Sequence, residues 1–379
     1  MPRHCIFFPE TRSRRGLIIM NITWINHRDI LSQNAGGAER TIYEVGRRLV
    51  ASGNSLTWLS VASDHRFEGF WKDGIKVIRL PGNILAHLAL PVLLKRTRAD
   101  IIVDDLGHAV PWGSQHFTDI PGTVFFRHLH ARSLQGQVRW PLRGIITAME
   151  KLYPYIYDSW PFVAESGTSM ADLEMLGISA VRISKIQPGV NTEFFRPAEK
   201  TAYPSVVYFG GFRDYKRPWE SLHVFRSILK EFPDARLTAI GNGPAMDRFR
   251  DTVHRLDLSS SVDITGRISS DQLRDIVSRS WINIHSSVTE GFGYSILEAS
   301  ASGTPTVAYS VPGVVEAIES GKNGITVGDG DREGLADAAK RIMGNFTHGW
   351  ISSARSVAEK YSWDITAGKW EQHLKRCAN

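Results

Sequence analysis

Two glutamates, Glu290 and Glu298, stand at the ends of the segment EGFGYSILE, with seven residues between them. Gly291 and Gly293 predict a tight turn after the first glutamate, and a helix follows that turn. This arrangement brings Glu290 and the backbone N–H groups of residues 292–295 together at a helix N-terminus. Glu298 lies about one helical turn further on. One carboxylate can therefore reach the hydroxyls of a sugar, and the other those of a ribose.

A second glycine-rich segment, NAGGAER (34–40), follows the first expected strand and opens a long helix. Gly36 and Gly37 let the backbone approach a ligand closely, and the free N–H groups at the helix start bind anions. The segment therefore predicts a diphosphate site. The alternative is a glycine turn needed only for the path of the chain, because the segment lacks the third glycine of a dinucleotide-binding fingerprint.

Basic residues follow the first strand expected in the second half of the chain, in the segment FGGFRDYK (209–216). Arg213 and Lys216 are expected near the carboxyl edge of that sheet, facing a cleft. Permanent positive charges there stabilise the charge that develops on a departing nucleoside diphosphate. The alternative is a solvated basic loop, which the segment taken alone favours.

Short apolar strands alternate with helical segments along the whole chain, which predicts parallel sheets with crossover helices. The pattern starts at Met20 and restarts at Ser205, after proline and charge interrupt it at Arg196-Pro197-Ala198. We expect two Rossmann-like domains, over 20–197 and 198–360, with the ligand in the cleft outside the carboxyl ends of the strands. The expected elements include strands at Thr123–Arg127 and Trp281–His285 and helices at Ala38–Ser52 and Val315–Ser320.

The 379-residue chain has the composition of a globular protein, with 42% hydrophobic and 22% charged residues. Its two cysteines, Cys5 and Cys377, lie at opposite ends, which favours a reducing cytoplasm over a disulfide framework. The net charge of +6 is too small to indicate nucleic acid, and no nucleic-acid-binding motif is present. Residues 1–19 are expected to be a flexible leader, with an edge strand at Cys5–Phe8 as the alternative.

Two segments of the first half place basic residues beside apolar or aromatic ones. The longest apolar run, Ile84–Leu94, is far shorter than the roughly 20 residues of a membrane-spanning helix, and Lys95, Arg96 and Arg98 follow it. The segment 138–157 carries three basic residues among a tryptophan and three tyrosines. Such mixtures suit the interface of an anionic bilayer and predict weak peripheral binding. A core-packed helix with a solvated edge is the alternative.

Taken together, these segments resemble the GT4 glycosyltransferases, a large group of retaining enzymes with the two-Rossmann GT-B fold. The segment 290–298 is similar to their E-x7-E motif, and KIQPGVNTEFFRP (185–197) resembles their interdomain linker. GGAER (36–40), ESGTSMADL (165–173), GTPTVA (303–308) and GKNG (321–324) follow the family's usual order. The resemblance covers nearly all of residues 20–370. It further implies a C-terminal helix over 361–379 that crosses back onto the first domain.

The resemblance implies a role for individual positions. Glu290 would contact the donor sugar, Glu298 would hold the nucleotide ribose, and Lys216 would meet the diphosphate. His128 or His130 would lie over the donor sugar; the spacing leaves the choice open, and His128 is favoured. The remaining expected donor contacts are Gly36, Gly37, Gly210, Gly211, Gly241, Gly243, Arg267, Gly291, Phe292, Gly293 and Tyr294.

The diphosphate site departs from the family at one position. Family members commonly carry an arginine about five residues before the lysine, where this chain has Gly211, and Arg213 is expected to substitute for it. The resemblance implies front-side attack, in which the leaving diphosphate accepts the acceptor's proton and the enzyme supplies positioning and electrostatic stabilisation. Asp104-Asp105 ends a strand and lacks the spacing of an Asp-x-Asp motif, so the reaction is expected to need no metal.

We therefore expect transfer of a sugar from a UDP- or GDP-sugar to a glycan, a lipid-linked or a small-molecule acceptor. The expected location is the cytoplasm, with peripheral contact at the inner face of the membrane. A nucleotide-sugar epimerase or hydrolase of the same fold is one alternative. A nicotinamide-dependent dehydrogenase requires a complete G-x-G-x-x-G, which the chain lacks. A non-catalytic sugar- or lipid-binding scaffold is the third, and Glu290 with the 128–130 histidines argues against it.

Overall fold

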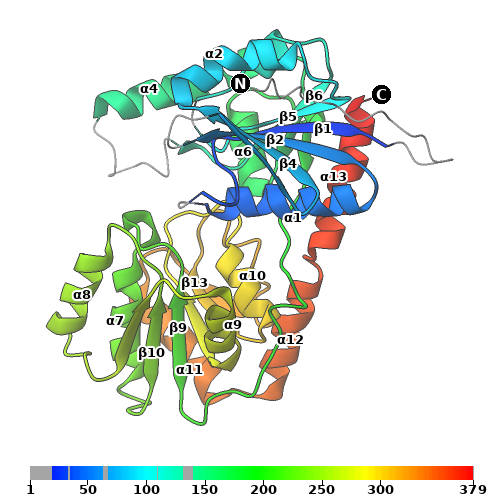
Figure 1. The fold of residues 1–379 in the computed structure, drawn as a ribbon. Helices are drawn as coiled ribbons and strands as arrows, with labels where there is room; N and C mark the ends of the chain where they lie inside the picture. The colour runs from blue at the N-terminus through cyan, green and yellow to red at the C-terminus, as the bar shows by residue number, and fades with distance from the viewer. Residues whose placement is uncertain (1–18, 33–34, 63–66, 109, 131–139, 379) are drawn as a thin grey trace.

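The computed structural model describes residues 19–32, 35–62, 67–108, 110–130 and 140–378. They form two lobes, each built on its own sheet (Figure 1). The chain passes from the first lobe to the second after β8 (Ile183–Lys185), and its last helix lies against the first lobe again. The expected leader over residues 1–19 lies outside the described residues except for Ile19.

The first domain is built on an eight-stranded sheet in the order β3-β4-β2-β1-β5-β6-β7-β8. The edge strand β3 pairs antiparallel with β4, and the other pairings are parallel. Strands β5 and β6 are buried along their whole length, which is typical of parallel strands with helices on both faces. The strands are β1 (Asn21–Ile25), β2 (Ser55–Ala62), β3 (Glu68–Lys72), β4 (Ile75–Pro81), β5 (Ile101–Asp105), β6 (Gly122–Phe126), β7 (Phe162–Ala164) and β8.

The second domain is built on a six-stranded, fully parallel sheet in the order β11-β10-β9-β12-β13-β14. The strand order reverses between β9 and β12, as it does between β1 and β5 in the first sheet. Such reversals open a crevice at the carboxyl ends of the strands, where ligands of open α/β sheets bind. The strands are β9 (Ser205–Phe209), β10 (Arg236–Ile240), β11 (Val262–Gly266), β12 (Ile282–His285), β13 (Thr306–Tyr309) and β14 (Gly324–Val327).

Helices cover both faces of each sheet and bury separate apolar cores. The helices of the first domain are α1 (Gly37–Ala51), α2 (Asn83–Leu94), α4 (Trp140–Glu150), α5 (Tyr153–Ile156) and α6 (Gly167–Met175). The second domain contributes α7 (Pro218–Ile228), α8 (Met246–Arg255), α9 (Ser270–Arg279), α10 (Tyr294–Ala301), α11 (Arg332–Gly344) and α12 (His348–Glu359). None of the helices described is both long and apolar enough to cross a bilayer.

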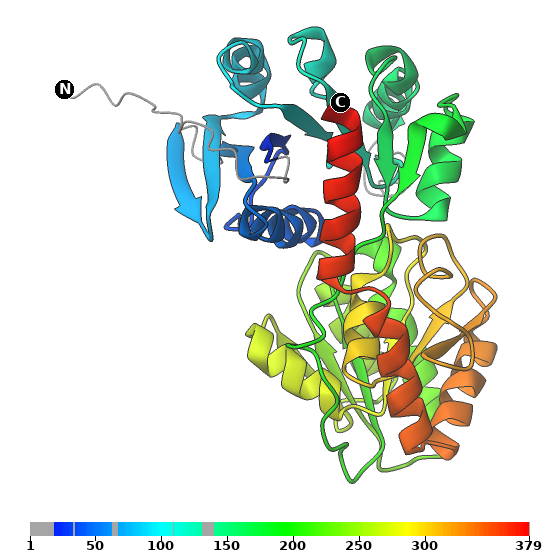
Figure 2. The same ribbon diagram turned by 90° about the vertical axis from the view of Figure 1, so that its right-hand side faces the viewer.

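The C-terminal helix α13 (Trp363–Ala378) packs against the first domain beside α1, as Figure 2 shows. The spacing of its apolar residues puts the Trp370 ring into an apolar core of the first domain. The centroid of this ring lies 4.7 Å from that of Trp24 and 4.9 Å from that of Phe125. The chain crosses between the domains at Gly189, where a Cβ atom would lie 2.6 Å from the Trp363 nitrogen. The expected return of the last helix to the first domain is confirmed.

One expected helix, Val315–Ser320, is wrong: residues 312–317 form successive turns instead. Gly313 has a φ of 78°, outside the helical range, and the side chain of Asn323 bonds the Glu319 nitrogen and the Ala317 oxygen. These side-chain bonds satisfy backbone groups that a helix would have paired within itself.

Candidate functional site

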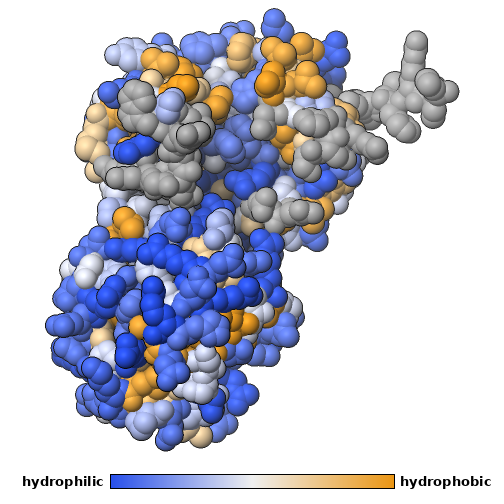
Figure 3. Space-filling view, turned by 90° about the vertical axis from the view of Figure 1, so that its left-hand side faces the viewer, coloured by the Kyte–Doolittle hydropathy of each residue, from blue (hydrophilic) through white to orange (hydrophobic). Residues whose placement is uncertain are grey.

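The loops at the carboxyl ends of both sheets meet between the two lobes. Hydrophilic side chains gather where the two lobes meet, and the surface is hollowed there (Figure 3). The segments that the sequence singled out lie in these loops and in the first turns of the helices that follow them: 36–40 follows β1, 128–130 follows β6, 210–216 follows β9 and 286–298 follows β12. The structure thus brings the main predicted segments to one cleft.

Glu290 is the centre of a charged cluster in the second domain. Lys216 Nζ donates a hydrogen bond to Glu290 Oε1, and Ser287 Oγ donates to the same oxygen at 2.6 Å. His285, the last residue of β12, places its Nε2 3.0 Å from that oxygen. The side chains of Lys216 and Glu290 keep 19% and 11% of their surface exposed, so both reach the solvent of the cleft.

Both members of this pair are held in their charged forms. Burial alone would raise the pKa of Glu290, but the Lys216 ammonium and His285 lower it well below its usual value. Burial would likewise lower the pKa of Lys216, and the Glu290 carboxylate raises it above the ordinary value. The second domain therefore presents a fixed ion pair to the cleft, with polar atoms suited to hydroxyl and phosphate oxygens.

The two candidate histidines of the first domain have different surroundings. Their rings lie 5.2 Å apart, and His130 is held by Glu150, which accepts a hydrogen bond from the His130 backbone nitrogen. Burial lowers the pKa of His128 to about 3, with the neighbouring His130 and Arg127 acting in the same direction. The charge of Glu290 raises that pKa and the charge of Lys216 lowers it, each by less than the effects within the first domain.

The N-terminal ends of α1, in the first domain, and of α10, in the second, contact each other between the domains. The Tyr294 ring packs on Gly37, where an added Cβ atom would lie 2.8 Å from it, so a larger residue at this position would displace the ring. The Tyr294 hydroxyl bonds Thr41 Oγ1 at 2.5 Å. One turn further along both helices, Arg40 makes an ion pair with Glu298. Tyr294 and Gly37, both predicted to contact the donor, thus contact each other here.

Sequence reasoning missed a buried charge cluster that supports these helices. Arg127 pairs with Asp105 at 2.8 Å and with Glu165, and it also donates to the Ala38 oxygen of α1 at 3.1 Å. The Tyr294 hydroxyl lies 3.3 Å from Glu165 Oε1. Asp105 is the last residue of β5, and Arg127 directly follows β6. Their position at the carboxyl edge of the sheet is the signal that could have identified them.

Gly36 stands at the N-terminus of α1 in the first domain, and the remaining predicted donor residues lie in the second-domain loops. The turns after β9 and β10 touch so closely that a Cβ atom on Gly241 would lie 1.9 Å from the Gly210 oxygen. Gly241 and Gly243 also have positive φ angles of 135° and 157°. The side chains of Arg213 and Arg267 are exposed, and Phe292 is buried in the domain core. The phenylalanine contributes its backbone rather than its ring to the loop that follows Glu290.

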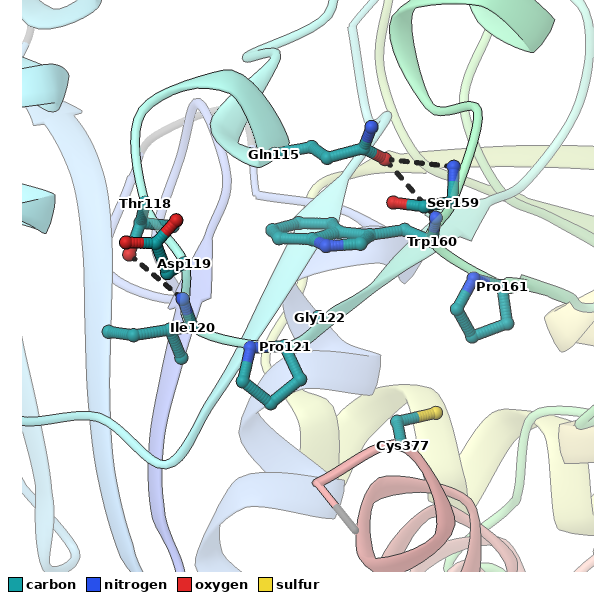
Figure 4. Close-up of a pocket in the computed structure, with 10 residues that line it drawn as sticks. All are labelled: Gln115, Thr118, Asp119, Ile120, Pro121, Gly122, Ser159, Trp160, Pro161 and Cys377. Atoms are coloured by element: carbon teal, nitrogen blue, oxygen red, sulfur yellow. Dashed lines mark hydrogen bonds between the residues drawn. The ribbon is translucent and has the colours of Figure 1, made fainter.

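The described residues show no metal-binding cluster, and they form a pocket away from this cleft. Among the residues described, no cluster of three or more His, Cys, Asp or Glu side chains is arranged to hold a metal ion. A pocket of about 370 Å³ opens at the amino ends of β6 and β7, where Gln115, Trp160 and Cys377 form part of its wall (Figure 4). It lies at the edge of the sheet opposite to the predicted site residues, and none of them lines it.

Comparisons with known proteins identify the family and the fold. Residues 35–194 match the sequence model of "Glycosyltransferase Family 4", and residues 190–356 match that of "Glycosyl transferases group 1". The structure resembles a sucrose-phosphate synthase from Thermosynechococcus elongatus, with a TM-score of 0.80 and 19% identity over 94% of this chain and 98% of that one. It also resembles an Anabaena protein solved in complex with UDP-glucose, with a TM-score of 0.75 and 14% identity over 94% of this chain and 100% of that one.

The chain belongs to the group 1 glycosyl transferases of the GT4 type, and its fold is GT-B. The predicted family and fold class are thereby confirmed. A curated relative, an exopolysaccharide phosphotransferase of Streptomyces coelicolor, is 31% identical over 203 residues, which are 52% of this chain. The match spans 21% of that relative's length.

Proposed function

We propose that this chain is a retaining glycosyltransferase that moves a sugar from a nucleoside-diphosphate sugar to an acceptor hydroxyl. The observation that carries the proposal is the Lys216–Glu290 ion pair, whose side chains keep 19% and 11% of their surface exposed in the loops at the carboxyl ends of the second sheet. Carboxylates recognise sugar hydroxyls, and ammonium groups recognise phosphate oxygens. Glu290 contacts the donor sugar, Lys216 and the exposed Arg213 contact the diphosphate, and Glu298 contacts the nucleotide ribose.

In this proposal the enzyme acts by placement and charge. The acceptor hydroxyl attacks from the face that the diphosphate leaves, and a diphosphate oxygen takes its proton. Lys216 stabilises the charge that develops on the leaving group, while Glu290 stays ionised and fixes the sugar. His128 is neutral at physiological pH, because burial lowers its pKa to about 3, so it acts as a hydrogen-bonding group rather than as a cation. No metal ion takes part.

The donor is a UDP- or GDP-sugar; the UDP-glucose complex of the Anabaena protein supports the former. The acceptor is a glycan or a lipid-linked or small-molecule hydroxyl that enters from the first domain. Peripheral contact with an anionic membrane is part of the proposal, supported by the exposed apolar side chains of α2 described below. Such contact would place the protein in the cytoplasm, at the inner face of the membrane.

The test is a panel of UDP- and GDP-sugars, incubated with the protein with and without candidate acceptors. Release of UDP or GDP identifies the donor, and NMR of the product gives the anomeric configuration. The proposal expects slow release without acceptor, acceleration by an acceptor, and retained configuration. An inverted product would contradict the mechanism. Turnover that no acceptor accelerates would favour a hydrolase or epimerase, and absence of both binding and turnover across the panel would favour a scaffold.

A further inference from the structure

The ion pair between Arg40 and Glu298 joins a residue of the first domain to one in the second. Among the residues described, Arg40 is the side chain that hydrogen-bonds the Glu298 carboxylate, and it does so at Oε1. The Glu298 side chain is 9% exposed, and that of Arg40 is 32% exposed. The pair therefore lies at the border between the interface and the open cleft.

The next acidic residue on α1 is already paired with other arginines, so it does not draw Arg40 away from Glu298. Glu44, the next acid on the same helix, is engaged by Arg47 at 2.7 Å and by Arg48 at 2.5 Å. The Arg40 guanidinium also lies 5.9 Å from the centroid of the buried Phe195 ring. The packing of Tyr294 on Gly37 holds α10 against α1, so Arg40 meets Glu298 across a fixed helix contact.

We propose that Arg40 is a positioning residue for the nucleotide ribose: it holds Glu298 through Oε1 and directs Oε2 toward the vicinal hydroxyls of the ribose. The inference rests on the proposed function, which gives Glu298 its ribose contact. A free glutamate samples many rotamers, and fixing it in its bound geometry before the nucleotide arrives raises affinity. The donor site of the second domain thereby depends on a cation of the first.

The test measures nucleotide affinity by isothermal titration calorimetry with UDP and GDP, each beside its 2′,3′-dideoxy analogue. The proteins are wild type, Arg40→Gln, Arg40→Lys and Glu298→Ala. The matched control is Arg47→Gln, which removes an arginine of α1 that is 35% exposed and pairs within its own helix. Circular dichroism and thermal melting verify that each variant is folded.

Arg40→Gln is expected to weaken binding of the preferred ribonucleotide about tenfold, the size of one lost charge-assisted hydrogen bond. Binding of the dideoxy analogue should change less than about twofold, because it lacks the hydroxyls that Glu298 contacts. Arg40→Lys should restore part of the difference, and Arg47→Gln should match wild type. In steady-state kinetics Arg40→Gln should raise the KM for the donor more than it lowers kcat.

Three results would overturn the inference. Equal weakening of both analogues by Arg40→Gln would assign Arg40 to the diphosphate or to the fold. Tighter ribonucleotide binding would make the pair a latch that the donor displaces, and unchanged binding would leave Arg40 without a role. If instead Glu298→Ala binds the ribonucleotide and its dideoxy analogue as wild type does, the ribose contact itself fails, and that result counts against the proposed function.

Discussion

Single residues determine the charge of the cleft. Lys216 and Glu290 neutralise each other, and each shifts the pKa of the other toward its charged form. A donor diphosphate then meets an ammonium that is already ionised, and a donor sugar meets a carboxylate that is already an acceptor. Because the pair is fixed before binding, little reorganisation is needed when charge develops on the leaving group.

The surroundings of the two histidines predict unequal effects of mutation. His128→Ala should lower kcat/KM for the donor by about 10²-fold, because it removes a neutral hydrogen-bonding group whose pKa responds to the charges of Glu290 and Lys216. His130→Ala should lower it less than about tenfold, since the His130 ring faces the first domain, with its Nδ1 3.6 Å from Glu150 Oε1. Parallel kinetics of the two variants decide the assignment, and a larger loss from His130→Ala would reverse it.

The two adjacent acids of β5 lead to a prediction about metals. Asp105 is bound by Arg127, and Asp104 accepts hydrogen bonds from Tyr157 and the Ser114 nitrogen, so both have protein partners. Activity should therefore persist within about twofold after treatment with excess EDTA, since Lys216 supplies the positive charge. Assays before and after chelation, with Mg²⁺ and Mn²⁺ added back, measure this. Complete loss that either metal restores would refute the metal-free reaction.

At the scale of elements, most of the architecture could be predicted, because parallel strands are continuous apolar runs between glycine and proline breaks. The edge strand β3 was missed. It is short and mostly exposed, although Asp73-Gly74, with φ angles of 47° and 79°, is a hairpin signal that the sequence carries. The link between Arg40 and Glu298 could not be predicted, since these residues are 258 positions apart and meet only through domain packing.

Helix α2 has an outer face without a protein partner among the described residues. Ile84, Leu85, Leu88 and Val92 keep between 52% and 79% of their surface exposed, and the basic residues at 95, 96 and 98 follow. Helix α4 lies in the same outer layer of the first domain, with Ile145 56% exposed (Figures 1 and 2). Apolar side chains beside cations are typical of surfaces that rest on anionic bilayers.

Vesicle binding tests this surface. The protein should co-sediment weakly with phosphatidylglycerol-containing vesicles at low salt and be released at high salt. Changing Lys95, Arg96 and Arg98 to Ser should reduce binding at low salt, at about 1 kcal/mol for each residue near the surface. Changing the exposed second-domain residues Arg226, Lys230 and Arg250 to Ser is the matched control. Binding that changes neither with salt nor with the substitution of Lys95, Arg96 and Arg98 would contradict peripheral contact.

The whole molecule should lose stability in acid. Burial lowers the pKa of His27 to about 2 and that of His373 to about 4, from an ordinary value of 6.5. Below pH 6.5 the unfolded chain takes up protons that the folded chain excludes, so the free energy of unfolding falls as pH falls. Each such histidine contributes a slope of up to about 1.4 kcal/mol per pH unit.

Melting temperatures between pH 7 and pH 5 measure this slope. His27→Phe should flatten it, because the variant has no imidazole to protonate in the unfolded state. His348→Gln, which changes an exposed histidine, is the control and should keep the wild-type slope. A wild-type melting temperature that stays constant over this range would contradict the argument, as would a wild-type slope in His27→Phe.

The central claim is that the cleft transfers a sugar from a nucleotide by means of Glu290. The most direct measurement is kcat/KM for release of the nucleoside diphosphate in the presence of an acceptor, in wild type and in Glu290→Gln. Glu371→Gln, which removes an ion-paired carboxylate from α13, is the control. The account predicts a loss on the order of 10²–10³ for Glu290→Gln with an unchanged far-ultraviolet spectrum, and wild-type turnover for Glu371→Gln. Wild-type turnover in a folded Glu290→Gln protein would contradict it.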